Sequence, residues 1–298
     1  MGLIILDAML PVLLDLKFIK IYTYGVFLVL AFFWGSFLLW KNIRLTSYKE
    51  EDVFDGLFFA LAGGLLLARL TYVVLNFQKF GFDLIKFILI NGYPGLSLYG
   101  GLFGGLAALW LFFVIKKIKF TEIIDYFISP LFLALVFGKL GSFFSGAEIG
   151  SKTKFFLSIK YVGFDSLRHL TPLYEAIFFI LGTYLAYRLL FEMRKEKYSH
   201  GFIFYFFCWY FALTNFLFDK IKGDHLYFLG QSLNFFVSII LLLTVSLYFL
   251  YYFKSLIGER LRLISSSFKY YGKKAYQKIY QRTKGKTRTR EDKNSKTN

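Results

Sequence analysis

Apolar residues in this chain occur in runs of about 20, the length with which an α-helix crosses the hydrocarbon core of a bilayer. Transmembrane β-strands are about half as long and alternate in polarity, a pattern that these runs lack. Of the 298 residues, 57% are hydrophobic, compared with roughly 45–50% in an average soluble domain. We therefore predict an all-α polytopic membrane protein with about seven transmembrane helices. The predicted spans are residues 19–40, 54–77, 96–116, 124–146, 171–191, 200–219 and 229–253.

The first segment, residues 1–18, is apolar but too short to span a membrane, and it contains Asp7, Pro11 and Asp15. It lacks the basic start and the small-residue cleavage site of a signal peptide. We predict that it forms an interfacial helix lying on the membrane surface.

The net charge of +17 is concentrated at the C-terminus, where residues 254–298 hold 14 Lys and Arg against three acidic residues. Such a basic tail suits RNA or anionic lipid. Because it follows a membrane helix, contact with acidic headgroups at the cytoplasmic face is the favoured interpretation, and no nucleic-acid partner is expected.

The distribution of Lys and Arg also predicts the orientation of the chain. With the N-terminus outside, the inner segments hold 24 Lys and Arg and the outer segments 10, but the counts are equal once the tail is left out. Cytoplasmic segments carry the excess of these residues, so the tail favours a C-terminus in the cytoplasm. We predict a membrane domain at 1–253, with extracytoplasmic segments at 78–95 and 147–170, and a cytoplasmic tail at 254–298.

Arg69 and Lys139 lie deep inside predicted spans, where charge is costly and usually functional. From the rise of a helix, Arg69 and Lys139 are expected roughly 10–12 Å below the outer boundary. Several other polar residues are expected at the same level, so that one cavity open to the outer leaflet is predicted. They are Tyr24, Tyr99, His169, Tyr174, Glu175, Asn215 and Asp219.

Two cations at this depth suit the phosphate of an anionic phospholipid, because Arg and Lys bind phosphate through charge-assisted hydrogen bonds. A purely structural interpretation is also open, in which Arg69 and Lys139 reach toward the interface or pair with Asp219 and Glu175. The glycine pairs at 63–64, 100–101 and 104–105 indicate close helix packing in spans 2 and 3.

Six short motifs, in order, resemble the prolipoprotein diacylglyceryl transferase family over most of residues 18–253. The most specific is Gly138-Lys139-Leu140-Gly141-Ser142-Phe143-Phe144-Ser145-Gly146-Ala147-Glu148-Ile149-Gly150, which is similar to the family signature Gly-Arg-x-Gly-Asn-Phe-x-Asn-Gly-Glu-x-x-Gly. The others are Thr23-Tyr24-Gly25, Ala68-Arg69-Leu70-Thr71-Tyr72, Gly95-Leu96-Ser97-Leu98-Tyr99-Gly100-Gly101, Arg168-His169-Leu170-Thr171-Pro172-Leu173-Tyr174-Glu175 and Leu229-Gly230-Gln231.

This resemblance implies an enzyme of the bacterial inner membrane that transfers diacylglycerol from phosphatidylglycerol to the lipobox cysteine of a prolipoprotein signal peptide. No metal and no cofactor are expected. The candidate catalytic residues are Tyr99, Lys139, His169 and Glu175. The candidate phosphatidylglycerol-binding residues are Tyr24, Arg69, Lys139, Ser142, Asn215 and Asp219.

The chain departs from the family pattern at several of these positions. Tyr99 stands for a histidine, Lys139 for an arginine, Ser142 for an asparagine, and Ala147 for a glutamate that here follows one place later as Glu148. The family's Arg-x-x-x-Glu-x-x-Arg in the sixth span is represented by Asn215, Asp219 and Lys222.

Because tyrosine, with an ordinary pKa near ~10, is a poor base at neutral pH, we expect His169 or Glu175 to supply the basic group. The alternative is a catalytically silent relative that binds anionic phospholipid or lipoprotein signal peptides.

Overall fold

The computed structural model describes residues 10–16, 19–89, 92–93, 95–161, 164–223, 227–228 and 231–254. The chain divides into two compact units, Met1–Leu242 and Leu243–Asn298. The first unit carries all the residues discussed below. The predicted basic tail lies outside the described residues, apart from Lys254.

Within the described residues, seven helices are long and apolar enough to cross a membrane, and the predicted fold class is thereby confirmed. Each overlaps most of a span predicted from the sequence. They are α1 (Thr23–Ile43), α2 (Glu50–Leu75), α5 (Leu98–Ile115), α6 (Phe120–Ser145), α7 (Thr171–Arg194), α8 (Phe202–Phe218) and α9 (Leu233–Tyr252).

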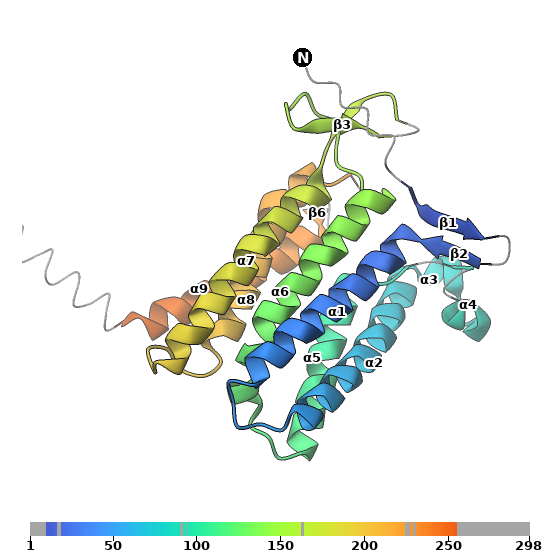
Figure 1. The fold of residues 1–298 in the computed structure, drawn as a ribbon. Helices are drawn as coiled ribbons and strands as arrows, with labels where there is room; N and C mark the ends of the chain where they lie inside the picture. Colours follow the sequence, from blue (N-terminus) through green and yellow to red (C-terminus); the bar gives the residue numbers. More distant parts are fainter. Residues whose placement is uncertain are drawn as a thin grey trace, which may run out of the picture. The chain divides into compact units, whose positions relative to one another are not determined.

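Short elements join these helices at the end where α1 begins and α2 ends, which we call the head end (Figure 1). Here lie the helices α3 (Phe77–Phe80) and α4 (Leu84–Ile88) and the hairpin of β3 (Ser158–Lys160) and β4 (Leu167–His169). The 3₁₀ turn η1 (Asp219–Ile221) and the strands β5 (Tyr227–Phe228) and β6 (Gln231–Ser232) follow α8.

The N-terminal prediction is wrong where the structure describes it. Instead of an interfacial helix, β1 (Val12–Leu16) and β2 (Ile19–Tyr22) form an antiparallel hairpin. Asp15 pairs across the hairpin with Lys20, and their charged groups lie 3.6 Å apart. A short apolar run is compatible with helix or strand, and cross-strand pairing decides for the strand here. Residues 1–9 lie outside the described part.

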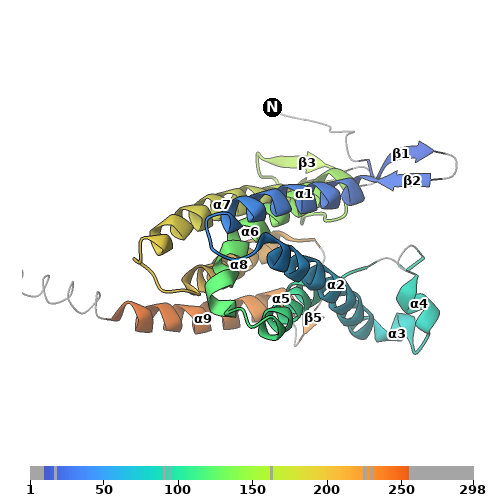
Figure 2. The same ribbon diagram turned by 60° about the horizontal axis from the view of Figure 1, so that its bottom comes forward.

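Helix α2 packs mainly against α5, and glycines allow this close approach (Figure 2). A Cβ added at Gly104 would lie 2.5 Å from the Cβ of Leu67 and 2.7 Å from the carbonyl oxygen of Gly63. The predicted close packing of the glycine pairs is confirmed.

Helix α6 packs against both α1 and α7 and has more buried residues than the other spanning helices. Pro130 inside it lacks a backbone N–H, which leaves the carbonyl of Tyr126, four residues earlier, without its helical partner. Asn42 of α1 donates its side-chain amide to this carbonyl at 2.9 Å and to the Ser129 hydroxyl at 3.0 Å. In a membrane such compensation is needed, because no water reaches the freed carbonyl.

At the opposite end from the head, Asp125 of α6 anchors the start of α8. Its carboxylate accepts hydrogen bonds from the backbone N–H of Gly201 at 2.6 Å and of Phe204 at 2.9 Å. The first N–H groups of a helix have no partner within the helix, and a carboxylate from the neighbouring helix provides one here. The carboxylate therefore fixes the α8 terminus to α6.

At the head end, the chain just after α6 pairs with the chain just after α8. Ser151 donates its backbone N–H to the carbonyl of Ile221 at 2.8 Å, and Gly223 donates to Ile149 at 2.9 Å. The hydroxyl of Thr171, at the start of α7, also donates to Ile221, at 3.0 Å. Three helix ends are thus tied together, and the polar residues that they carry meet.

Candidate active site

Lys139 of α6 lies between two carboxylates. Its Nζ is 2.7 Å from Oε2 of Glu148 and 2.6 Å from Oε2 of Glu175. Only 8% of the residue is exposed. Because an unpaired ion in the protein interior costs several kcal/mol, the two carboxylates offset the burial of this lysine.

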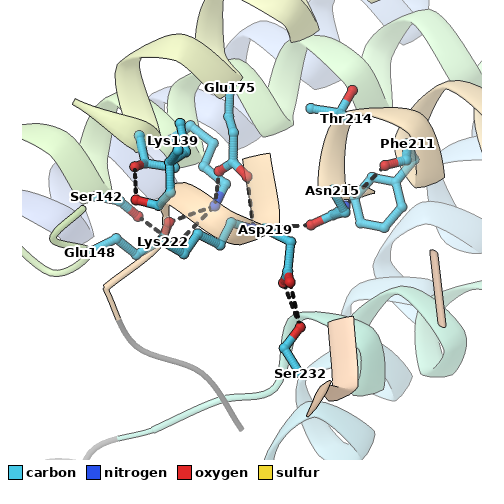
Figure 3. A network of polar contacts seen from close by, with 12 residues as sticks. Lys139, Ser142, Glu148, Glu175, Phe211, Thr214, Asn215, Asp219, Lys222 and Ser232 are labelled. Carbon is cyan, nitrogen blue, oxygen red and sulfur yellow. Dashed lines mark hydrogen bonds and ion pairs between the residues drawn. The ribbon is translucent and has the colours of Figure 1, made fainter. Parts of the chain in front are cut away.

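Glu175 of α7, which is 1% exposed, also binds a second lysine (Figure 3). Nζ of Lys222 lies 2.8 Å from Oε1 of Glu175 and donates to Oδ1 of Asn215 at 3.1 Å. The cluster Glu148–Lys139–Glu175–Lys222–Asn215 therefore alternates in charge along most of its length. We call it the lysine–glutamate cluster.

Glu148 reaches Lys139 because of the turn that ends α6. Gly146 adopts a left-handed conformation, with φ of 68°, directly after the helix. Ala147 donates its backbone N–H back to the carbonyl of Ser142 at 3.0 Å, which is the hydrogen bond of a Schellman motif. The chain turns back over the helix terminus and places Glu148 above Lys139.

Tyr24 and Ser142 lie beside the cluster, as predicted from the sequence. The Ser142 hydroxyl is 3.4 Å from Oε1 of Glu148. A Cβ added at Gly141 would lie 3.2 Å from the Tyr24 ring. The tyrosine hydroxyl is close to Ser142 and within electrostatic reach of Lys139.

A second group of polar residues adjoins the cluster. Asp219, which is 4% exposed, accepts the Ser232 hydroxyl at 2.6 Å from each carboxylate oxygen. The buried Tyr99 hydroxyl faces Ser238 and lies within electrostatic reach of Asp219 and Glu175. In the described part of the chain, neither Tyr99 nor Ser238 makes a hydrogen bond of normal geometry through its hydroxyl.

Arg69 belongs to a different network, at the junction of α2 with the segment before α5. Its guanidinium donates to the backbone carbonyls of Lys86 at 2.7 Å, Phe87 at 2.8 Å, Tyr93 at 2.7 Å and Gly95 at 2.9 Å. Four of its five N–H donors are therefore bonded to the protein itself. The phosphate-binding role expected for Arg69 stays a prediction.

His169 lies in β4, and its contacts are within the head segment rather than with the cluster. Its ring is 6.0 Å from that of Phe155 and 6.2 Å from that of Tyr174. Burial lowers its pKa from the ordinary value of 6.5. Among the described residues nothing hydrogen-bonds to its Nδ1.

Residues 11–252 match the family model described as prolipoprotein diacylglyceryl transferase. The chain belongs to the prolipoprotein diacylglyceryl transferase family. The phosphatidylglycerol–prolipoprotein diacylglyceryl transferase of Clostridioides difficile (strain 630) is 28% identical over 208 residues, which are 70% of this chain and 81% of the clostridial protein. The enzyme of the same name from Clostridium tetani (strain Massachusetts / E88) is 27% identical over 219 residues, covering 72% and 86% of the two chains.

The geometry accounts for two departures from the family pattern. Glu148 stands one position after the family glutamate, yet it contacts Lys139, which replaces the signature arginine. Asn215 lacks the charge of the family arginine, but it holds Lys222 in contact with Glu175.

Lys222 and Glu148 were not among the site residues predicted from the sequence, although both occur in the motifs. Asn215, Asp219 and Lys222 are spaced by four and three residues, a spacing that in a helix puts side chains on one face, so it was a usable signal for Lys222. In the structure α8 ends at Phe218, and Lys222 follows the turn η1. Ser232 and Ser238 gave no such signal.

Proposed function

We propose that this chain transfers the diacylglyceryl group of phosphatidylglycerol to the thiol of a lipobox cysteine, the first step of lipoprotein maturation. The observation that carries the proposal is the lysine–glutamate cluster. Two lysines with little exposure, Lys139 and Lys222, converge on one buried glutamate at the head end. A phosphate that leaves during the reaction needs cations that are already in position.

In the proposed reaction, the cysteine thiolate attacks the glyceryl carbon that carries the phosphate. A C–S bond forms while the C–O bond to phosphate breaks, and glycerol phosphate leaves with the electron pair. Lys139 and Lys222 stabilise the phosphate, and Glu175 holds the two lysines together. Tyr24, Ser142, Asn215 and Asp219 line the headgroup region around them.

The thiol must also lose a proton, because the thiolate is the nucleophile. We propose His169 as the acceptor. Burial lowers the pKa of its imidazole, which favours the neutral form that can accept a proton, and its Nδ1 is not bonded to any described residue. Tyr99 then serves as a hydrogen-bond donor rather than as a base.

We further propose that the head end faces the outer side of a bacterial inner membrane. The preference of Lys and Arg for the cytoplasmic side supports this orientation. The substrates are then phosphatidylglycerol and the signal peptide of a prolipoprotein, both of which are accessible from the outer leaflet.

The test is lipidation of a lipobox peptide in membranes that contain equal amounts of each variant, with release of glycerol phosphate measured in parallel. Lys139→Met removes a charge-assisted contact with phosphate, worth about 1.5–3 kcal/mol, and should lower turnover by roughly 10–100-fold. Lys139→Arg restores the family residue and should remain active.

Lys119→Met is the matched control, because the Lys119 side chain is 77% exposed and directly precedes α6, at the end of that helix opposite to the cluster. A peptide with serine in place of the lipobox cysteine should accept no lipid. If the wild-type chain released no glycerol phosphate while still binding phosphatidylglycerol, the silent relative would replace the enzyme.

A further inference from the structure

The lysine–glutamate cluster is balanced in charge before any lipid binds. Lys139 and Lys222 carry two positive charges, and Glu148 and Glu175 carry two negative charges within 2.8 Å of them. Asp219 adds a further carboxylate nearby. A phosphodiester headgroup brings one more anion, so the full set of carboxylates would oppose its entry at this low-dielectric site.

The two carboxylates that bind Lys139 differ in how firmly the surrounding protein holds them. The Glu175 side chain is 1% exposed and bonded to both lysines, whereas the Glu148 side chain is 43% exposed. Glu148 lies in the turn after α6 and not in a helix. Apart from Lys139, its one side-chain hydrogen bond in the described structure is the long contact with Ser142, at 3.4 Å.

Removing Glu175 would leave two buried lysines without a shared partner, which is costly. Moving Glu148 instead takes a half-exposed carboxylate into water, where it is well solvated. The vacated face of Lys139 could then receive a phosphate oxygen, which makes the same kind of charge-assisted hydrogen bond. The lysine would lose no charge compensation in this exchange.

We propose that Glu148 occupies the position of the headgroup phosphate on Lys139 and is displaced from it when the lipid binds. This inference rests on the proposed function, because it concerns the same lipid site. Glu148 is accordingly the residue that sets the affinity for an anionic headgroup, by competing with it. Binding exchanges one anion for another and leaves the charge of the cluster unchanged.

The competition predicts that weakening the resident anion strengthens the lipid complex. Glu148→Gln keeps the shape of the side chain and removes its charge. We expect the Kd for dioleoyl phosphatidylglycerol in detergent micelles to fall about three- to tenfold, because the lipid no longer displaces a charged partner of Lys139. Inhibition by free glycerol phosphate should strengthen in the same direction, since it offers the same phosphate.

Glu192→Gln is the control, because this glutamate pairs with exposed lysines at the other end of α7. A double-mutant cycle with Lys139→Met separates competition from a general effect on the fold. Once Lys139 is absent, Glu148→Gln should no longer change the lipid affinity, because no shared cation remains. Glu148→Ala serves as the second variant if the glutamine substitution impairs folding.

An unchanged or weaker lipid affinity in folded Glu148→Gln protein would overturn the proposal, and so would an equal gain in the Lys139→Met background. Failure of the proposed function looks different, because wild-type protein would then release no glycerol phosphate. The binding measurement does not depend on turnover and decides the role of Glu148 in either case.

Discussion

Replacing Arg69 tests whether this buried cation binds the lipid phosphate or holds a segment of its own chain. Its four hydrogen bonds go to carbonyls of residues 86, 87, 93 and 95, all in the segment between α3 and α5. The guanidinium carbon also lies 5.1 Å from the centre of the Phe80 ring. Arg69→Met removes all of these donors, and Arg69→Lys retains the charge but not the planar fork.

The free energy with which Arg69 holds this segment follows from the number of its hydrogen bonds. These carbonyls lie outside the long helices and can rehydrate, so each bond is assigned about 0.5–1.5 kcal/mol. Four of them give roughly 2–6 kcal/mol for holding the segment. At 1.4 kcal/mol per decade, even the lower limit of ~2 kcal/mol raises the population of the released segment by about 30-fold.

Trypsin cleavage after Lys86 reports this release directly. The carbonyl of Lys86, which belongs to the scissile bond, accepts from Nη2 of Arg69 at 2.7 Å. Arg69→Met should accelerate cleavage at this bond by about 30-fold or more, and Arg69→Lys should give an intermediate rate. The affinity for phosphatidylglycerol should change less than in Lys139→Met.

The opposite pattern would refute this reasoning. If Arg69→Met left the cleavage rate unchanged and weakened lipid binding as strongly as Lys139→Met, Arg69 would be a phosphate ligand. That is the role predicted from its expected depth in the membrane. Cleavage fragments should be identified by mass, so that release at Lys86 is distinguished from cleavage at other lysines.

Three further predictions concern the fold. Gly104→Val should destabilise the α2–α5 pair and lower the Tm in detergent, because the added atoms would meet Leu67 and backbone of α2, whereas Gly138→Ala should not, since nothing lies within 4 Å of its Cβ position. Asp125→Ala should cost about 2–3 kcal/mol by leaving two N–H groups of α8 unpaired, and Asp125→Asn should lower the Tm less. Burial lowers the pKa of His169 from 6.5, so the folded chain binds its proton less readily than the unfolded chain, and stability is lost as the pH falls below about 6.5. A His169→Gln variant should show a smaller drop in Tm between pH 7 and pH 5 than the wild-type chain. An equal drop in both would show that protonation of His169 does not cause the loss of stability.

The seven helices were predictable from sequence because length and hydropathy alone determine a span in lipid. The N-terminal hairpin was not, because Val12–Leu16 is a short apolar run whose conformation depends on its pairing with Ile19–Tyr22. Local composition does not distinguish a strand from an interfacial helix at this length.

The sequence predicted most of the residues that form the candidate site, but not the contacts that each of them makes. Lys139 and Glu175 share one depth, and that followed from their distance to the helix ends. The direction in which Arg69 points did not follow, because its partners lie 17 to 26 residues further along the chain. A long side chain at a known depth can turn to either side of its helix, and only the fold determines which carbonyls it meets.

The position of Glu148 shows how the departures from the family pattern fit together. A lysine offers a compact charge that carboxylates can approach from several directions, unlike the planar fork of arginine, and Lys139 accordingly accommodates two of them at 2.6 and 2.7 Å. The glutamate one place after the family position lies on an exposed turn, so its hold on this lysine is reversible while that of Glu175 is not. Restoring only the arginine, by Lys139→Arg, should strengthen the reversible contact with Glu148, because the planar fork binds a carboxylate through two donors. Lipid entry should then slow, although the variant stays active. Combining it with Glu148→Gln should reverse that effect, because the competing charge is then gone.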